Sequence, residues 1–367
     1  MLKEFMSNLT IISVLTVINS FLLVYFIIPK ISWIITSRDL HDKPNKRSSH
    51  ITSTPTMAGV SFFLTLILTT FFIQNFDTDT VGLNLIASLT LMFMVGLKDD
   101  LVVSTPKAKL FTEVLAILFL LLSESLHIDS LHGFLGIYEI PIVLSYIITI
   151  LMMLTIINAF NLIDGIDGLA SIIAIIIFSV FALIFFSTQF YYYFLICLSL
   201  IGILLAYLNY NFSHTQKIFM GDTGSLIIGF CIGFIALKYL AMDVSNLMRF
   251  TLQPQNELIV LAAILWIPLF DLLRVMVIRL YHKKSPFHPD RNHAHHILID
   301  AGLSHFNTTL FMGFINYAVV ILVIWLSSFW NHLQMLAVLT ILFIIGVTVL
   351  YLIKKRTLLK NNNSNSL

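Results

Sequence analysis

The sequence has 367 residues, of which 58% are hydrophobic and only 11% are charged. Soluble domains carry about 25% charged residues, so this composition excludes an ordinary soluble protein and indicates a membrane protein. The formal net charge of +2 says little by itself, and we expect no nucleic-acid partner. Both cysteines, Cys197 and Cys231, lie in apolar runs without CxxC spacing, so we expect core residues rather than a disulfide or metal site.

The apolar runs predict an all-α, polytopic membrane protein with about eleven transmembrane helices, because most of them can cross about 30 Å of hydrocarbon. In chain order the predicted spans are 10–35, 57–74, 82–97, 110–123, 142–161, 169–187, 191–208, 224–241, 257–280, 309–328 and 334–353. The first run is too long for the apolar region of a signal peptide, so we expect it to be retained. We treat 1–353 as a single transmembrane domain and expect the polar tail, 354–367, to be disordered.

The distribution of lysine and arginine predicts the orientation. Among the 21 Lys and Arg residues, only Lys3, Lys238 and Arg249 fall on or near one side of the predicted membrane. The others lie in or beside the loops of the opposite side, which are 36–56, 98–109, 162–168, 209–223, 281–308 and the C-terminal tail. Because basic loops stay in the cytoplasm, we expect the N-terminus outside and the C-terminus in the cytoplasm.

Five polar stretches fall in these cytoplasmic loops. In chain order they read "DKPNKRSSHITSTPTMAG", "GLKDDLVVSTPKAKL", "NAFNLIDGIDGLAS", "NYNFSHTQKIFMGDTGS" and "SPFHPDRNHAHH". Loops that are far apart in sequence can converge on one face of a helical bundle. Carboxylates that suit a cation would then meet Lys, Arg and His side chains that suit an anion.

Three carboxylates in these stretches are candidates for cation binding or catalysis. Asp99 and Asp100 are adjacent, so on a helix they point about 100° apart and cannot act from the same direction; the alternative is an acidic helix end in solvent. Asp222 lies between two glycines, ahead of an apolar run. There it can be a simple helix cap or a hard oxygen ligand for Mg²⁺.

The basic candidates suit phosphate. His293, His295 and His296 lie within four residues and follow Arg291, and no cysteine is near to complete a zinc site. With Lys107 and Lys109 on the same side, phosphate binding is favoured, because Arg and protonated His donate charge-assisted hydrogen bonds to phosphate oxygens. Contact with anionic lipid headgroups is the alternative.

The stretch "NAFNLIDGIDGLAS" places Asn158, Asn161, Asp164 and Asp167 three residues apart. Nine residues of a straight α-helix turn a side chain through about half a circle, so these four cannot share one face. We therefore predict that the helix tightens or ends near Gly165 or Gly168, and that the polar groups lie at the membrane edge.

Together, the five stretches resemble those of the polyprenyl-phosphate N-acetylhexosamine-1-phosphate transferases, which form glycosyltransferase family 4. The "HAHH" that follows "SPFHPDR" is more similar to the undecaprenyl-phosphate N-acetylglucosamine-1-phosphate transferases than to phospho-MurNAc-pentapeptide translocase, which has three consecutive histidines. The resemblance implies transfer of a HexNAc-1-phosphate, with GlcNAc favoured, from a UDP-sugar to undecaprenyl phosphate, with release of UMP. It also implies the first membrane step of a cell-envelope polysaccharide pathway at the cytoplasmic face of the bacterial inner membrane.

The resemblance further implies roles for matching positions. Asp222 and Asn161 would bind Mg²⁺, with Mn²⁺ as the alternative, and Asp99 and Asp100 would be the catalytic pair. Contacts to the substrates, UDP-HexNAc and undecaprenyl phosphate, are implied for Lys109, Lys107, Asp164, Asp167, Gly168, Leu169, His293, His295, His296, Arg291, Lys43 and Asn45. Direct attack and a phospho-aspartate intermediate both remain open, as does a homodimer.

Two other functions remain as alternatives. One is phospho-MurNAc-pentapeptide translocase activity, and the other, from a different class, is secondary transport. Transporters place ionisable groups near the bilayer midplane, whereas the acids here lie at span ends, with Glu113 and Asp271 the nearest exceptions. Arg274 is one helical turn from Asp271 and can pair with it.

Overall fold

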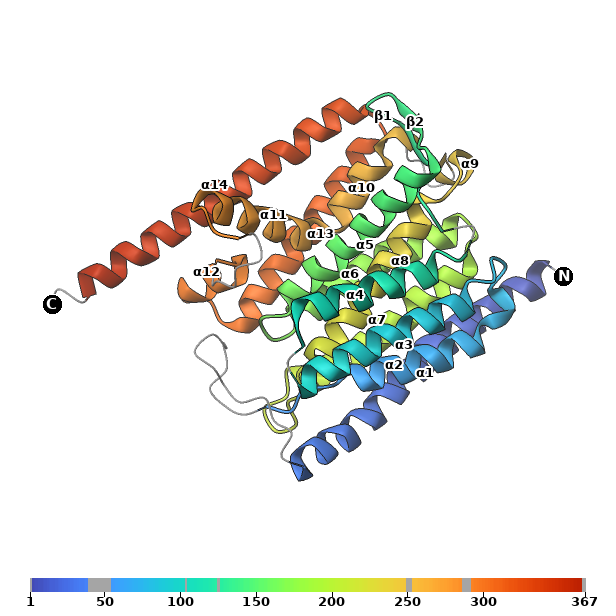
Figure 1. The fold of residues 1–367 in the computed structure, drawn as a ribbon, viewed down its shortest axis with the longest axis horizontal. Helices are drawn as coiled ribbons and strands as arrows, with labels where there is room; N and C mark the ends of the chain where they lie inside the picture. Colours follow the sequence, from blue (N-terminus) through green and yellow to red (C-terminus); the bar gives the residue numbers. More distant parts are fainter. Residues whose placement is uncertain are drawn as a thin grey trace.

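The computed structural model describes residues 2–38, 54–102, 104–123, 126–248, 253–285 and 292–364, which form a bundle of long helices with one β-hairpin (Figure 1). Within these residues, 8 helices are long and apolar enough to cross a membrane, or up to 9 if a bent pair counts as one span. The predicted all-α, multi-pass membrane class is therefore confirmed, while the number of spans and their orientation remain predictions.

The helices follow the predicted spans in chain order. Their bounds are α1 Leu2–Ser37, α2 Gly59–Phe72, α3 Gly82–Leu101, α4 Pro106–Leu120, α5 Ile142–Ile163, α6 Leu169–Ser187, α7 Tyr191–Asn211, α8 Gly221–Leu240, α9 Val244–Leu247, α10 Glu257–Ile264, α11 Trp266–Tyr281, α12 Ala294–Asp300, α13 His305–Ser327 and α14 His332–Ser364. Each predicted span overlaps one of these helices, except that 257–280 corresponds to the pair α10 and α11.

Two features differ from the expectations. A hairpin of β1 (Ser130–Phe134) and β2 (Ile137–Glu139) lies in the loop before α5, where no strand was predicted. Helix α14 continues to Ser364, so it reaches into the polar tail, 354–367, for which the sequence predicts disorder. The stretch "KKRTLLKNNNS" contains no Gly or Pro to end a helix, and it begins with good helix formers.

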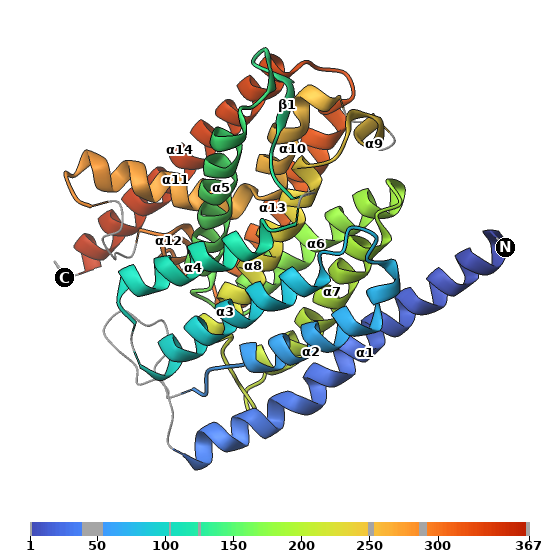
Figure 2. The same ribbon diagram turned by 45° about the vertical axis from the view of Figure 1, so that its right-hand side comes forward.

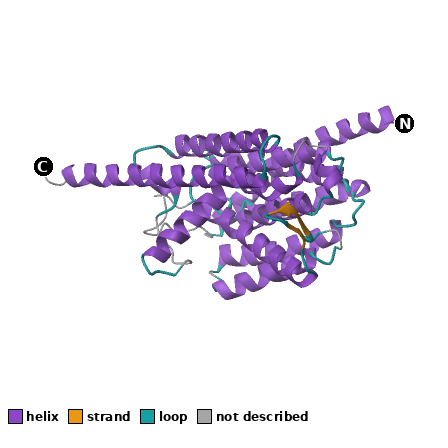
Figure 3. Cartoon of the chain, turned by 90° about the horizontal axis from the view of Figure 1, so that it is seen from above, coloured by secondary structure: helices purple, strands orange, loops and turns teal. Residues whose placement is uncertain are grey.

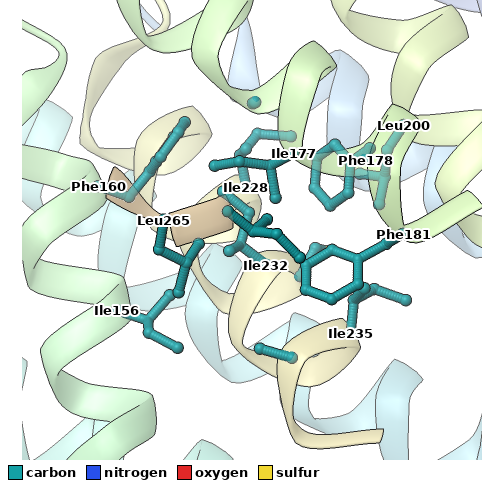
Figure 4. Close-up of a cluster of buried hydrophobic side chains, with 14 of the residues drawn as sticks. Ile156, Phe160, Ile177, Phe178, Phe181, Leu200, Ile228, Ile232, Ile235 and Leu265 are labelled. Atoms are coloured by element: carbon teal, nitrogen blue, oxygen red, sulfur yellow. The ribbon is translucent and has the colours of Figure 1, made fainter. Parts of the chain in front are cut away.

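Helix α8 forms the core of the bundle. Its residues from Thr223 to Leu240 are all buried. Ile228 and Ile232 of α8 meet Phe160 of α5 and Phe181 of α6 in a close-packed apolar cluster (Figure 4). Because protein interiors are packed this densely, the position of α8 along its axis is fixed, and so is the position of its first turn.

Glycines let α2 and α3 touch the backbone of α8. A Cβ atom on Gly59 would lie 2.2 Å from the backbone nitrogen of Gly224, and one on Gly96 would lie 2.5 Å from the Cα of Thr223. Neither distance leaves room for a methyl group. The close approach brings the last turn of α3 against the first turn of α8.

Gly96→Ala is expected to lower the free energy of unfolding by about 1–3 kcal/mol, because the added methyl group must push the backbone of Thr223 away. Thermal unfolding of the purified protein in detergent measures the effect. Leu83→Ala, at an exposed position of the same helix, is the control and should change the melting temperature little. An unchanged melting temperature for Gly96→Ala would show that α3 and α8 do not pack as described.

The pair α10 and α11 is bent by 76°. Pro268 has no N–H group, so it cannot donate to the carbonyl of Ile264 one turn earlier. Asn316 of α13 supplies the missing partners: its side-chain amide donates to the Ile264 carbonyl at 3.3 Å and its oxygen accepts the N–H of Ile267 at 3.0 Å. The bend is therefore set by the proline and satisfied by a fully buried side chain of another helix.

Candidate functional site

Four helix ends bring predicted site residues together. The Lys109 Nζ lies 2.8 Å from an oxygen of Asp222 and 3.2 Å from an oxygen of Asp99. The Asn161 amide donates to the same Asp222 oxygen at 2.9 Å and to the hydroxyl of Ser225 at 2.8 Å. The Asp222 side chain is 37% exposed, so this group, which we call the Lys109 cluster (Asp99, Lys109, Asn161 and Asp222), is open to a ligand.

The two adjacent aspartates have different surroundings. Asp100 accepts the N–H groups of Asp222 at 2.7 Å and of Thr223 at 3.0 Å, and also the hydroxyl of Thr223. It thus caps the first turn of α8, where N–H groups lack partners within the helix. Asp99 instead accepts the N–H of Ser104 at 2.7 Å and faces Lys109. Their divergence agrees with the predicted 100° between neighbours on a helix.

The polar stretch between α5 and α6 breaks the helix as predicted. Helix α5 ends at Ile163, and Gly168, with φ +74°, precedes α6. Asn158 donates to the Glu113 carboxylate at 3.2 Å, one turn before Asn161 reaches Asp222. The side chains of the stretch therefore diverge toward different neighbours.

Asp164 lies beside this break, at the end of α5, and makes no side-chain hydrogen bond within the described residues. Burial, together with the negative charges of Asp222, Asp100 and Asp167, raises the pKa of the Asp164 carboxyl to about 7. The group therefore keeps its proton in the folded protein over a pH range in which it is ionised in the unfolded chain.

This raised pKa predicts a pH dependence of stability. Between pH 3.8 and about 7 the folded state binds the Asp164 proton and the unfolded state does not, so stability falls as pH rises through this window. Asp164→Asn should flatten that part of the profile. Thermal unfolding at pH 5 and pH 8 without divalent cations measures it: the melting-temperature difference should be smaller in the variant than in the wild type. An equal difference would mean that Asp164 does not carry this proton.

Asp167 lies in a second polar group. One of its carboxylate oxygens is 2.7 Å from Lys217 Nζ and 3.2 Å from a ring nitrogen of His305, while its backbone carbonyl accepts the hydroxyl of Thr309 at 2.8 Å. The sequence predicted Asp167 as a site residue but missed Lys217, His305 and Thr309. Lys217 lies within a quoted polar stretch, whereas no spacing pattern connects His305 to Asp167.

The fold also holds in place the two predicted site residues that follow Asp167, which are Gly168 and Leu169. The N–H of Gly168 donates to the side chain of Asn211 at 2.6 Å, and Leu169 is fully buried. Asn211 also donates to Tyr207 and to the carbonyl of Ile218. Asn211 thus ties the start of α6 to the loop that leads into α8.

The histidines of the fifth stretch are anchored on α11. Asp271 accepts Arg274 Nη2 at 2.8 Å, which confirms the predicted pairing, and it also accepts the N–H of Ala294 at 2.8 Å. A ring nitrogen of His293 lies 2.8 Å from the other Asp271 oxygen. The buried carboxylate therefore fixes the beginning of α12.

His295 does not have the exposed position expected of a charged phosphate contact. It is buried, and a Cβ on Gly165 would lie 2.4 Å from its Nε2, so the ring packs on the break between α5 and α6. Burial, with the positive charge of His296 adding to it, lowers the pKa of His295 to about 3, so the ring is neutral at neutral pH.

Some predicted residues are not brought to the Lys109 cluster. Lys107 is exposed and makes no ion pair within the described residues. Lys43, Asn45 and Arg291 lie outside the described residues. Since Lys107 and Lys109 are two positions apart on α4, their side chains point in different directions, and only Lys109 faces Asp222.

The Lys109 cluster suits a hard cation, although the described part of the chain contains no group of three or more His, Cys, Asp or Glu side chains with metal-site geometry. Mg²⁺ is usually held by one or two carboxylates together with waters and substrate phosphates, so a closed cage of side chains is not required. Asp99 and Asp222 already converge on one positive group, the Lys109 ammonium. Their oxygens are of the type that Mg²⁺ prefers.

Comparison with known proteins gives consistent similarities. The family model for glycosyl transferase family 4 matches residues 83–240, which run from α3 through α8. The chain is 31% identical over 296 residues to an undecaprenyl-phosphate alpha-N-acetylglucosaminyl 1-phosphate transferase of Pasteurella multocida, covering 79% of both chains. Proteins of the same name from Haemophilus influenzae (29% over 306 residues, 82% of both chains) and Yersinia pestis (30% over 269 residues, 72% of this chain and 71% of the relative) are also similar.

Proposed function

Because the chain belongs to glycosyl transferase family 4, we propose that it transfers N-acetylglucosamine 1-phosphate from UDP-GlcNAc to undecaprenyl phosphate and releases UMP. The observation that carries this proposal is the Lys109 cluster, in which an ammonium group lies between two carboxylates of different helices. The names of the similar proteins support the choice of sugar and acceptor.

The chemical problem is to bring two phosphates together. In the proposed direct route, an oxygen of undecaprenyl phosphate attacks the β-phosphorus of UDP-GlcNAc. The bond between the β-phosphorus and the oxygen that bridges it to the α-phosphorus then breaks, and that oxygen leaves with UMP. Lys109 would stabilise the negative charge that develops on the transferred phosphoryl oxygens, because its ammonium lies at the centre of the cluster.

The two aspartates of α3 would have different roles. Asp99, which faces Lys109, would orient the acceptor phosphate and take its proton when it binds as the monoanion. Asp100 would act as a positioning residue, because both of its oxygens are engaged by the first turn of α8. Asp222, held by that turn, would keep its place relative to Lys109.

Asp222 and Asn161 would hold Mg²⁺, or Mn²⁺ in its place. When bound, the cation would neutralise charge on the pyrophosphate. The carbonyl oxygen of Asn161 is the atom that would face it, so the amide that now donates to Asp222 would have to turn. The Asp167 group, with Lys217 and His305, would lie beside the nucleotide.

We further propose that this face of the bundle lies in the cytoplasm of a bacterium, at its inner membrane. The basic loops support this orientation through the positive-inside rule. The location suits both substrates, because the nucleotide sugar is dissolved in the cytoplasm and the polyprenyl chain lies in the bilayer.

The test uses membranes that contain the protein, incubated with radiolabelled UDP-GlcNAc or UDP-MurNAc-pentapeptide, with or without undecaprenyl phosphate. Label from UDP-GlcNAc should enter a butanol-extractable lipid only when the acceptor is present. Label from UDP-MurNAc-pentapeptide instead would favour the translocase, and the absence of any labelled lipid would favour a transporter.

A further inference from the structure

A cavity of about 600 Å³ lies between α11, α12 and α14, apart from the Lys109 cluster. Figures 1 and 2 both show these three helices together on one side of the bundle, away from α1, α2 and α3. Its lining contains none of the residues of the Lys109 cluster. We call it the α14 cavity.

The lining of the α14 cavity combines basic and apolar side chains, and on α14 the two lysines lie between Val347 and Leu350 before them and Leu358 and Leu359 after them. The basic side chains are Arg274 and His282 of the α11 region and Lys354 and Lys355 of α14, and the described lining includes no Asp or Glu. The apolar wall includes Val347 and Leu350. On α14 these apolar residues precede the two lysines by one to two turns, which is about 6–12 Å at 1.5 Å per residue.

The cavity opens toward the surroundings of the bundle. Helix α14 runs along the outside of the bundle, and the C-terminal end of this helix extends past the other helices (Figures 1 and 3). Tyr351, Lys354 and Lys355 are exposed on it. A groove with apolar side chains on either side of a basic group matches a phospholipid, with an acyl chain against the apolar wall and a phosphate at the lysines.

We propose that the α14 cavity binds an anionic glycerophospholipid whose headgroup phosphate contacts Lys354, Lys355 and His282. Charge complementarity selects this occupant, because the described residues of the lining include several basic side chains and no acidic one. Arg274 also lines the cavity; its Nη2 pairs with Asp271, and its Nε has no hydrogen-bond partner within the described residues. The lipid is distinct from the acceptor, whose phosphate must reach the Lys109 cluster on other helices.

A chain of contacts links this lipid site to the histidine loop. Lys354 donates to the side-chain oxygen of Asn292 at 2.7 Å, and the backbone carbonyl of Asn292 accepts Arg274. Arg274 pairs with Asp271, which also holds His293. A headgroup that orders Lys354 therefore also orders Asn292, the residue directly before His293.

The test measures lipid binding directly and does not require turnover. Full-length protein in detergent micelles is titrated with spin-labelled phosphatidylglycerol or spin-labelled phosphatidylcholine, and the immobilised fraction is recorded. The double variant Lys354→Gln/Lys355→Gln should weaken phosphatidylglycerol binding roughly 10- to 30-fold, since each of the two lysines near a membrane surface contributes roughly three- to fivefold. Phosphatidylcholine binding should be weak in both proteins.

The matched control is Lys283→Gln/Lys284→Gln, which removes the same charge from two exposed lysines that do not line the cavity. Equal phosphatidylglycerol binding by the two double variants would overturn the proposal. So would displacement of the labelled lipid by stoichiometric undecaprenyl phosphate, because the cavity would then belong to the acceptor. Failure of the proposed transferase activity leaves this binding experiment unchanged.

Discussion

Asp222→Asn should lower the rate of UMP release on the order of 10³-fold at ordinary Mg²⁺ concentration. The substitution removes one of the two carboxylates that flank Lys109, and with it the oxygen proposed to hold the metal. The expected loss lies mainly in kcat, because the cation that Asp222 would hold acts on the transferred phosphoryl group rather than on the sugar. A Mg²⁺ titration of UMP release and lipid labelling measures it.

Asp243→Asn is the matched control for Asp222→Asn. Asp243 is an exposed carboxylate ahead of α9, and its side chain makes no capping hydrogen bond. This variant should keep wild-type activity. Size-exclusion elution and circular dichroism in detergent should show that both variants remain folded. Full activity of Asp222→Asn at ordinary Mg²⁺ would refute the metal assignment.

Asp99→Asn and Asp100→Asn should fail in different ways. Asp99→Asn should reduce kcat roughly 10²- to 10³-fold while the melting temperature stays near that of the wild type, because its carboxylate faces Lys109 at the open cluster. Asp100→Asn should cost about 1–3 kcal/mol of stability, because the amide has one acceptor oxygen in place of two and cannot accept the N–H groups of both Asp222 and Thr223. Its activity should fall because Asp222 moves.

The two properties are measured on the same preparations, as UMP release and thermal unfolding in detergent. The Asp100 variant should show the larger drop in melting temperature. The Asp99 variant should lose more kcat than its small change in melting temperature explains. The opposite pattern would exchange the proposed roles of the two aspartates.

Much of the Lys109 cluster could be predicted from the sequence, because each member lies in a polar stretch at the end of an apolar run. Asp99, Lys109, Asn161 and Asp222 were all predicted, and the structure brings them within hydrogen-bond distance. What the sequence could not give was the pairing. Asn161 of α5 contacts Asp222 of α8 because the dense packing around α8 fixes the positions of the two helices along their axes.

The directions and contacts of several other side chains could not be predicted from the sequence. Lys107 and Lys109 belong to one short motif, and only the direction of α4 decides which of them faces Asp222. His293 and His295 are two residues apart and both are buried, yet His293 faces Asp271 whereas His295 packs against Gly165. His305 stands alone in the sequence, and its contact with Asp167 depends on how α13 packs on α6. Pro268 indicates the bend between α10 and α11 in the sequence. Nothing in the sequence indicates that Asn316 stabilises this bend.

The bend at Pro268 also has a consequence for how the protein is made. The side chain of Asn316 forms hydrogen bonds with the carbonyl of Ile264 and the N–H of Ile267, and Asn316 is synthesised after both residues. Until α13 has entered the membrane, α10 and α11 carry two backbone groups without their native partners in a setting that penalises them. His305, which contacts Asp167, arrives on the same helix. Ribosome-bound chains that end before α13 therefore lack the partner of these two backbone groups and the contact between His305 and Asp167, so both are completed only after α13 has been synthesised.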